Sequence, residues 1–227
     1  MKIFAFIFAR GGSKGIKNKN IIKINNKPLI YYSIHLAKKM KEIDEVYVSS
    51  DSNNILNIAK KLGAKIIVRP KNISNDKSPE LLAWKHAIQF LKKQQISFDI
   101  FLSLPTTAPL RSIIDIKKIL KLIKKKNVDY VITAKKSHNN PWFNMVKKNR
   151  NGYFEKVIST KSKFNTRQEA PLTFDMTTIG YASRPGYILK SNDMMKGKVK
   201  MVEIPEQRSL DVDTLFDLKL AKLLIKQ

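Results

Sequence analysis

Short apolar runs alternate with amphipathic stretches along most of this chain, and no other feature limits its possible folds as strongly. The apolar runs are typical of strands and occupy residues 2–8, 45–50, 65–68, 98–104 and 128–134. The stretches between them repeat apolar residues at helical spacing, at residues 28–40, 51–64, 79–93 and a segment that begins near Arg111. Strands that alternate with helices favour a mostly parallel sheet covered by helices. We therefore predict an α/β domain.

The alternation breaks between residues 136 and 178. Residues 139–158 are typical of a β-hairpin, because Arg150-Asn151-Gly152 is a turn signal between two segments of extended pattern. The strand pattern returns beyond the break, at residues 179–185 and 199–204. An excursion of this kind from a sheet often covers a substrate or joins two subunits. We predict a single domain of residues 1–227 with an inserted arm at about residues 137–178.

The charge of the chain is strongly positive. Lys and Arg number 44 against 18 Asp and Glu, which gives a formal net charge of +26 and a pI near 10.1. A basic surface can recruit nucleic acid through its phosphates, so a basic nucleic-acid-binding protein is one alternative for the function. The lysines, however, recur on the polar faces of the predicted helices, which indicates general lysine usage rather than one binding face. We therefore expect no specific nucleic-acid partner.

The residue types and segments that the sequence lacks exclude several classes of protein. The chain contains no cysteine, which excludes disulfide frameworks, thiol nucleophiles and cysteine-ligated zinc. The apolar run near the start is short and has no cleavage-site pattern, so we expect no signal peptide. No segment reaches the ~18 apolar residues of a membrane span. We expect a cytoplasmic protein with no membrane span.

A glycine-bearing loop follows the first predicted strand. Its glycines are not spaced as in the G-x-G-x-x-G dinucleotide fingerprint, and Lys14 precedes Gly15 where a P-loop needs the reverse order. Adjacent glycines nevertheless let backbone N–H groups approach an anion, and charged and hydroxyl donors flank them. These residues are Arg10, Gly11, Gly12, Ser13 and Lys14. We predict a polyphosphate site at the carboxyl end of this strand, with a solvated turn as the alternative.

Two aspartates, Asp211 and Asp213, lie two residues apart just before the last predicted helix. In an extended segment alternate side chains share a face, so both carboxylates can converge on one site. Mg²⁺ prefers oxygen ligands and commonly takes one or two carboxylates together with substrate phosphates. The alternative is a structural role, with Asp213 as the N-cap of the helix. The residues alone leave these two interpretations open.

The glycine loop matches the opening motif of a known family. It resembles the A-R-x-x-S-K-G-x-x-x-K-N motif of the acylneuraminate cytidylyltransferases, or CMP-sialic acid synthetases, at Arg10, Ser13, Lys14, Gly15, Lys19 and Asn20. The likeness continues in chain order through NKPLIYYSI, VYVSSD, Arg69-Pro70, PTTAPLR, TRQ and IPEQRSLDVDTLFDL, and so covers nearly the whole chain. It implies an α/β, Rossmann-like nucleotidyltransferase fold with a mostly parallel sheet and a protruding dimerisation or substrate arm.

The resemblance also implies a reaction. The enzyme would transfer CMP from CTP to the anomeric hydroxyl of a nonulosonic acid of the sialic, legionaminic or pseudaminic type, with release of pyrophosphate. Kdo cytidylyltransferases share this chemistry and are a close alternative. The implied partners are CTP, a sugar acid and a second copy of the chain in a homodimer, and the implied cofactor is Mg²⁺. The resemblance favours the metal-binding interpretation of Asp211 and Asp213.

The matched motifs imply a role for each site residue. The catalytic residues would be Arg10, Lys14 and Lys19, which hold and stabilise the triphosphate. The nucleotide would also contact Gly11, Gly12, Ser13, Asn20 and Arg69. The sugar acid would contact Arg111, Arg167 and Gln168, and the metal would bind Asp211 and Asp213.

The chain departs from the family pattern at two positions. Pro105 stands where the family motif has a glutamine, and Asp175 stands where the family has a cation. An acid that pointed inward at residue 175 would repel the carboxylate of a sugar acid. The sequence therefore favours the cytidylyl donor more strongly than any particular sugar.

Overall fold

The computed structural model describes residues 1–13, 15–159, 164 and 166–225, and a central sheet organises them. Within this part of the chain the sheet has seven strands in the order β11-β7-β10-β6-β1-β4-β5. All neighbouring strands are parallel except that β10 runs antiparallel to β6 and β7. The strands are β1 (Ile3–Phe8), β4 (Glu45–Ser50), β5 (Lys65–Val68), β6 (Ile100–Ser103), β7 (Tyr130–Lys136), β10 (Phe174–Ser183) and β11 (Val199–Glu203). The predicted mostly parallel α/β architecture is confirmed.

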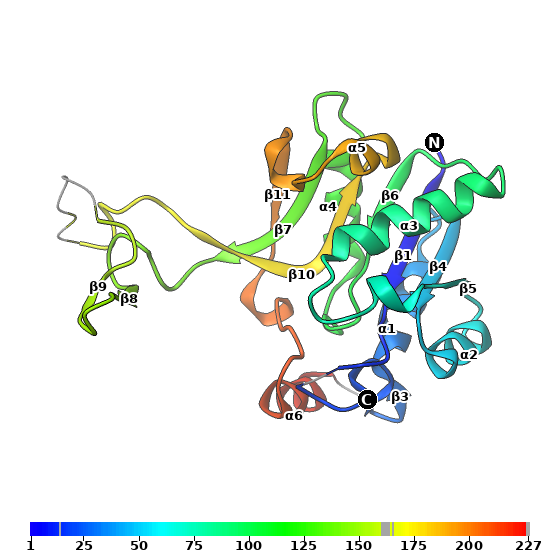
Figure 1. The fold of residues 1–227 in the computed structure, drawn as a ribbon, viewed down its shortest axis with the longest axis horizontal. Helices are drawn as coiled ribbons and strands as arrows, with labels where there is room; N and C mark the ends of the chain where they lie inside the picture. Colours follow the sequence, from blue (N-terminus) through cyan, green and yellow to red (C-terminus); the bar gives the residue numbers. More distant parts are fainter. Residues whose placement is uncertain (14, 160–163, 165, 226–227) are drawn as a thin grey trace.

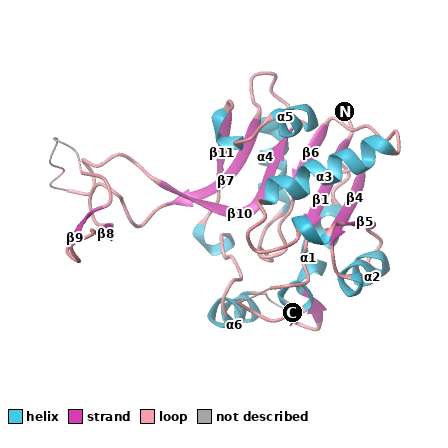
Figure 2. Cartoon of the chain, in the orientation of Figure 1, coloured by secondary structure: helices cyan, strands magenta, loops and turns pink. Residues whose placement is uncertain are grey.

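Helices cover both faces of the sheet (Figure 1). They are α1 (Leu29–Lys39), α2 (Asn53–Lys61), α3 (Glu80–Lys93), α4 (Ile113–Ile123) and α5 (Pro185–Lys190), whereas α6 (Leu215–Leu224) packs in a separate cluster with Ile24 and Val212. The short elements are β2 (Lys23–Ile24), β3 (Lys27–Pro28) and the 3-10 helices η1 (Lys19–Ile21), η2 (Lys71–Ile73), η3 (Met194–Lys196) and η4 (Glu206–Arg208). Figure 2 shows that long loops join these elements at one edge of the sheet. No helix in the described ranges is long and apolar enough to cross a membrane.

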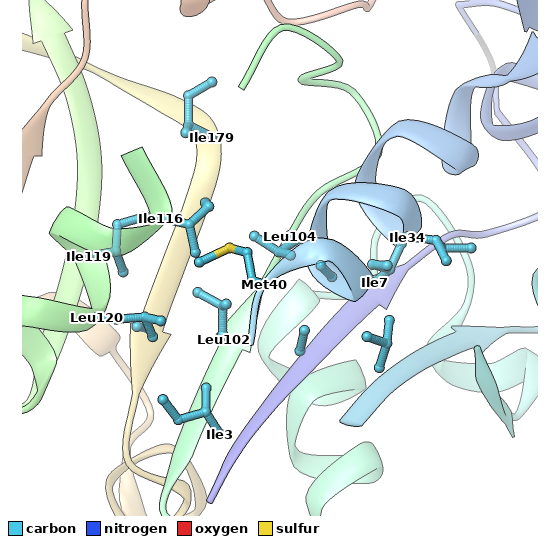
Figure 3. Packing of buried hydrophobic residues seen from close by; sticks show 14 of the residues in the cluster. Ile3, Ile7, Ile34, Met40, Leu102, Leu104, Ile116, Ile119, Leu120 and Ile179 are labelled. Atoms are coloured by element: carbon cyan, nitrogen blue, oxygen red, sulfur yellow. The ribbon is translucent and has the colours of Figure 1, made fainter. Parts of the chain in front are cut away.

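The two faces of the sheet bury different kinds of side chain. Aliphatic residues of α1, α2 and α4 pack on one face, as Figure 3 shows for Ile34, Ile116 and their neighbours. On the other face α3 packs on aromatic rings, and the Phe6 and Phe101 ring centroids are 4.5 Å apart. Strand β1 contributes to both cores because successive side chains point to opposite faces. A central parallel strand is buried on both sides, which explains its continuous apolar sequence.

The segment between β7 and β10 projects away from the sheet (Figure 1). It carries the predicted hairpin, in which β8 (Val146–Lys148) pairs antiparallel with β9 (Phe154–Lys156). Gly152 has a φ of +88°, a left-handed conformation that glycine adopts without strain. This segment corresponds to the predicted arm.

The strand predicted at residues 179–185 has other bounds in the structure. Strand β10 already begins at Phe174, and Pro185 starts the short helix α5. The first half of β10 pairs with β7 through Asp175 and Thr177, whose polar side chains concealed the strand in the sequence. The pairing partner of a strand, rather than its own hydrophobicity, determines where such an edge segment begins.

Candidate functional site

A cavity of about 470 Å³ lies at the carboxyl ends of the parallel strands. The glycine loop follows β1, Asp51 follows β4, Arg69 follows β5 and the segment Pro105–Thr107 follows β6. Ligands in open α/β sheets bind at this edge because the loops after the strands meet there. We call it the loop cavity, and its lining includes Arg10, Ser13, Gly15, Lys19, Asn20, Arg69, Asp76, Glu80, Thr107 and Asp213.

Hydrogen bonds hold the glycine loop against the sheet. The backbone N–H of Gly11 donates to Oδ1 of Asp51 at 3.0 Å, and Nδ2 of Asn20 donates to the carbonyl of Arg10 at 2.9 Å. The guanidinium of Arg10 forms an ion pair with the Asp76 carboxylate. A β-carbon on Gly12 would meet no described atom within 4 Å, so the backbone there is open to a ligand. The predicted catalytic residue Lys14 lies outside the described residues.

The glycine loop touches the segment that carries the two predicted metal-binding aspartates. A β-carbon on Gly15 would lie 2.7 Å from the carbonyl oxygen of Asp213, so only glycine permits this approach. The ammonium of Lys19 is 2.6 Å from Oδ1 of Asp213. The structure therefore brings together two predicted groups of site residues that lie at opposite ends of the sequence.

Asp213 is not the N-cap of the last helix. Helix α6 begins after Thr214, whose hydroxyl accepts from the N–H of Asp217 while the Asp217 carboxylate accepts from Thr214 in a capping box. The Asp213 side chain is therefore not needed for capping and lines the loop cavity. Asp211 lines a second cavity of about 640 Å³ between α6 and β10, which we call the α6 cavity. Asp213 and Asp211 thus belong to the linings of two different cavities.

The environment of Asp211 fits a metal ligand. Burial raises the pKa of Asp211, and the charge of Asp213 adds to this effect, while hydrogen bonds from Thr107 and Thr178 act in the opposite direction. Oδ1 of Asp211 is buried without a hydrogen-bond partner among the described residues. A buried carboxylate oxygen without a donor is unfavourable unless a cation or a ligand reaches it. Two carboxylates beside the predicted polyphosphate site match the oxygen ligands that Mg²⁺ prefers.

Arg69 is a buried cation in the wall of the loop cavity. Burial lowers its pKa, while Asp51 and Glu80 act in the opposite direction. Its Nη2 lies 3.9 Å from Oδ1 of Asp51, and its Nε has no partner among the described residues. Arg69 lines the loop cavity, and its contact with a nucleotide stays a prediction.

The three predicted sugar-binding residues lie in different places. Arg111 is enclosed in the protein, where its guanidinium binds Ser33, Pro105 and Thr178. Arg167 and Gln168 lie on the arm, where both line a separate hollow of about 340 Å³. The Arg167 guanidinium donates to the carbonyl of His138. The structure does not bring these residues into the loop cavity of their own chain.

Several residues of the site were not predicted from the sequence. Asp51 and Asp76 bind the loop backbone and Arg10, while Thr107 and Thr178 bind Asp211. Asp51 directly follows β4, a strand that neighbours β1. This position could have indicated from the sequence that Asp51 lies near the glycine loop. The threonines carry no such signal, because the pairing of distant strands brings them together.

The comparisons with known proteins agree with this geometry. Residues 4–204 match the family model described as Cytidylyltransferase. The CMP-N,N'-diacetyllegionaminic acid synthase of Campylobacter jejuni is 34% identical over 227 residues, with 99% of this chain and 95% of the relative covered. The pseudaminic acid cytidylyltransferase of Campylobacter jejuni is 32% identical over 230 residues, with 100% of this chain and 97% of the relative covered.

A solved structure supports the fold. The structure of CMP:2-keto-3-deoxy-manno-octonic acid synthetase complexed with CTP superposes with a TM-score of 0.72 at 17% identity, and the match covers 99% of this chain and 98% of that chain. The sheet, the cavity at its carboxyl edge and the family match over most of the sequence lead to one conclusion. The chain is a nucleotidyltransferase that belongs to the cytidylyltransferase family.

Proposed function

We propose that the enzyme transfers CMP from CTP to the anomeric hydroxyl of a nonulosonic acid of the sialic, legionaminic or pseudaminic type. The observation that carries the proposal is the contact of the glycine loop with Asp213 beside one cavity at the carboxyl edge of the sheet. Two relatives that match 99% and 100% of the chain are named for legionaminic and pseudaminic acids, which supports this class of acceptor.

The reaction is a single displacement at phosphorus. The acceptor oxygen forms a bond to the α-phosphorus of CTP, the bond to the bridging oxygen of pyrophosphate breaks, and the acceptor hydroxyl loses its proton. Arg10, Lys19 and the open backbone at Gly12 would hold the triphosphate, and Lys14 would add a further charge. Arg69 would bind the nucleoside from the buried wall. Positioning and charge neutralisation supply most of the rate enhancement in transfer of this kind.

Asp211 and Asp213 would hold Mg²⁺ together with oxygens of the substrates. The ion would neutralise charge at the transferred phosphorus and the leaving pyrophosphate. The described residues contain no group of three or more potential side-chain ligands, so phosphate oxygens would complete the coordination.

The acceptor would bind next to Asp211, on the side of the α6 cavity. Lys135 lines this cavity and offers a charge for the carboxylate of a sugar acid. Arg167 and Gln168 lie on the projecting arm, so we propose that they reach the sugar acid bound to a second copy of the chain in a homodimer.

Pyrophosphate release tests the reaction. The enzyme, CTP and Mg²⁺ are incubated with a panel of sialic, legionaminic, pseudaminic and Kdo acids. We expect release with one nonulosonic acid, and loss of that release in Asp211→Ala. Release with Kdo alone would contradict the proposed acceptor class, and failure of the protein to bind CTP would contradict the proposal as a whole.

Mixing of inactive variants tests the arm. Asp213→Ala and Arg167→Ala chains are unfolded together and refolded as a mixture. If the arm acts across the dimer, mixed dimers contain one intact site, and activity returns to a fraction of the wild-type value. If each chain uses its own arm, the mixture stays as inactive as its components, and light scattering reports whether a dimer is present at all.

A further inference from the structure

Arg111 is a buried cation held by neutral oxygens. Its Nη1 donates to Oγ of Ser33 at 3.1 Å, and its Nη2 donates to the carbonyls of Thr178, at 3.2 Å, and Pro105. Burial lowers the pKa of Arg111 to about 9, so the guanidinium is protonated at neutral pH. No described carboxylate lies within ion-pair distance of it. A buried charge is unfavourable without strong partners, which indicates that these bonds serve a purpose.

The segment 105–107 hydrogen-bonds both to the region of the glycine loop and to the segment that carries Asp211 and Asp213. The Thr106 hydroxyl donates to Oδ1 of Asn20, and Asn20 in turn binds the carbonyl of Arg10. The carbonyl of Thr107 accepts from the N–H of Val212 at 2.8 Å, between the two aspartates. Any shift of this segment would therefore move the glycine loop and the aspartate segment together.

Two threonines from distant parts of the chain lie beside Asp211. Thr107 follows β6 and Thr178 lies in β10, and their hydroxyl oxygens are 3.4 Å apart. Burial raises the pKa of Asp211, and hydrogen-bonding with these two threonine side chains opposes that rise. Arg111 binds the carbonyl of Thr178 itself and the carbonyl of Pro105, two residues before Thr107. One guanidinium thus binds the backbone of both segments that carry these threonines.

We propose that Arg111 is a positioning residue for the metal site, because it holds Thr107 and Thr178 where they orient Asp211 toward the metal. The inference rests on the proposed function, since it assumes that Asp211 binds the metal. Arginine suits this position because its planar fork donates in several fixed directions at once. Lysine would keep the charge but could not reproduce that fork.

Metal binding without turnover tests the inference. Mn²⁺ is titrated into the full-length protein with CTP and without a sugar acid, and electron paramagnetic resonance measures the free Mn²⁺. In Arg111→Lys we expect Mn²⁺ to bind at least ~10-fold more weakly, the usual effect of losing an outer-shell partner of a metal ligand. Asp211→Asn provides the reference for loss of the ligand itself.

Arg184 is the matched control. Its guanidinium also donates three hydrogen bonds, here all to carbonyls, those of Val128 at 2.5 Å, Lys125 at 3.1 Å and Ile123 at 3.2 Å, but Arg184 lines neither cavity. Both Arg→Lys variants should have a lower Tm than the wild type, because each loses hydrogen bonds from a guanidinium to backbone carbonyls. Only Arg111→Lys should weaken Mn²⁺ binding. An equal loss of Mn²⁺ affinity in Arg184→Lys would show that Arg111 acts only through the general stability of the fold.

Ser33→Ala keeps the test decisive if Arg111→Lys does not fold. The Ser33 hydroxyl accepts from Arg111 and donates to the carbonyl of Pro105 at 3.0 Å. Ser33→Ala therefore removes two hydrogen bonds of the same group but keeps Arg111 itself. We expect a several-fold weaker Mn²⁺ affinity. If folded Arg111→Lys binds Mn²⁺ with wild-type affinity, the inference is wrong. If Arg111→Lys does not fold, wild-type affinity in Ser33→Ala contradicts the inference instead. Either result leaves the proposed function standing. Failure of the wild-type protein to bind Mn²⁺ with CTP overturns the proposed function and this inference with it.

Discussion

Lys19 and Asp213 form an ion pair across 194 positions of the sequence, with Nζ 2.6 Å from Oδ1. The Lys19 side chain is mostly enclosed, while that of Asp213 is open to the loop cavity. The pair joins the region after the glycine loop to the aspartate segment before α6. The same two regions would contact the triphosphate and the metal in the proposed reaction.

The cations of the loop cavity should contribute to turnover rather than to stability. Arg10→Ala and Lys19→Ala should each lower kcat by ~10²-fold or more, the scale of losing one donor to a transition-state charge. Each ion pair is partly exposed and contributes little to stability, so Tm should change little. Steady-state pyrophosphate release and thermal melts check both points, and an unchanged kcat in either variant would remove that residue from the catalytic group.

Gly15 should tolerate no side chain. Gly15→Ala places a β-carbon 2.7 Å from the Asp213 carbonyl, so the loop and the aspartate segment must separate and activity should fall strongly. Gly186→Ala is the control, because its β-carbon would meet no described atom within 4 Å. Pyrophosphate assays of both variants, with Tm as the folding check, should separate them. Equal activity would mean that the contact with Asp213 has no functional importance.

Gly12→Ala reports directly on the ligand. The new β-carbon meets no described atom of the protein, so the fold should be unaffected. If the triphosphate lies against this backbone, the methyl group should weaken CTP binding. Calorimetric titration with CTP measures the effect, and wild-type affinity would place the phosphates elsewhere in the cavity.

Asp211→Asn should inactivate the enzyme and yet stabilise it. Burial raises the folded-state pKa of Asp211, so the folded protein holds this proton more tightly than the unfolded chain does. The free energy of unfolding therefore falls as pH rises from the ordinary aspartate pKa through the raised pKa of the folded protein, and the ionised carboxylate carries this stability penalty. Asparagine removes it. Melts without metal at neutral pH should show a higher Tm for the variant, with the gap closing as pH falls; a lower Tm would show that the carboxylate is stabilising.

The ion pair of the buried Asp115 with the partly exposed Arg208 should stabilise the segment before Asp211. Burial alone would raise the pKa of Asp115, but hydrogen bonds from Arg208 and Ser112 lower it overall. Arg208→Met should lose about 3 kcal/mol of unfolding free energy at neutral pH, because it leaves a buried carboxylate without its cation.

The sign of the pH dependence provides a second check on this pair. A depressed folded pKa stabilises the protein above the ordinary aspartate pKa, and this contribution disappears as pH falls through the folded value. The difference between wild type and Arg208→Met should therefore narrow in acid. Urea unfolding at several pH values measures it, and a constant difference would exclude the ion pair as the cause.

Local patterns predicted much of the fold and part of the site. The apolar runs predicted β1, β4 and β5, and the helix predicted to begin near Arg111 is α4, which starts with a Ser112–Asp115 capping box. The predicted polyphosphate loop lies at the carboxyl end of β1, where the topology of parallel sheets requires it. These features depend on neighbours within a few residues, which a sequence displays directly.

Contacts between distant segments could not be predicted in this way. Asp175 and Thr177 form the start of β10 only because β7 pairs with them. The motif that contains Arg111 suggested a sugar contact, whereas the structure encloses its guanidinium among Ser33, Pro105 and Thr178. Burial of a charge depends on which segments meet around it, and no local pattern carries that information.

The sequence by itself determined the alternation of strands and helices, the donors of the glycine loop and the spacing of Asp211 and Asp213, because periodicity and motif are local properties of a chain. The tertiary structure alone decided that Gly15 and Lys19 meet Asp213, that Thr107 and Thr178 lie beside Asp211, and that Arg111 binds the carbonyls of Pro105 and Thr178. Sheet order and register decide these contacts, because they bring the segments after β1 and β6 and the middle of β10 together, and Val212 then hydrogen-bonds to the carbonyl of Thr107.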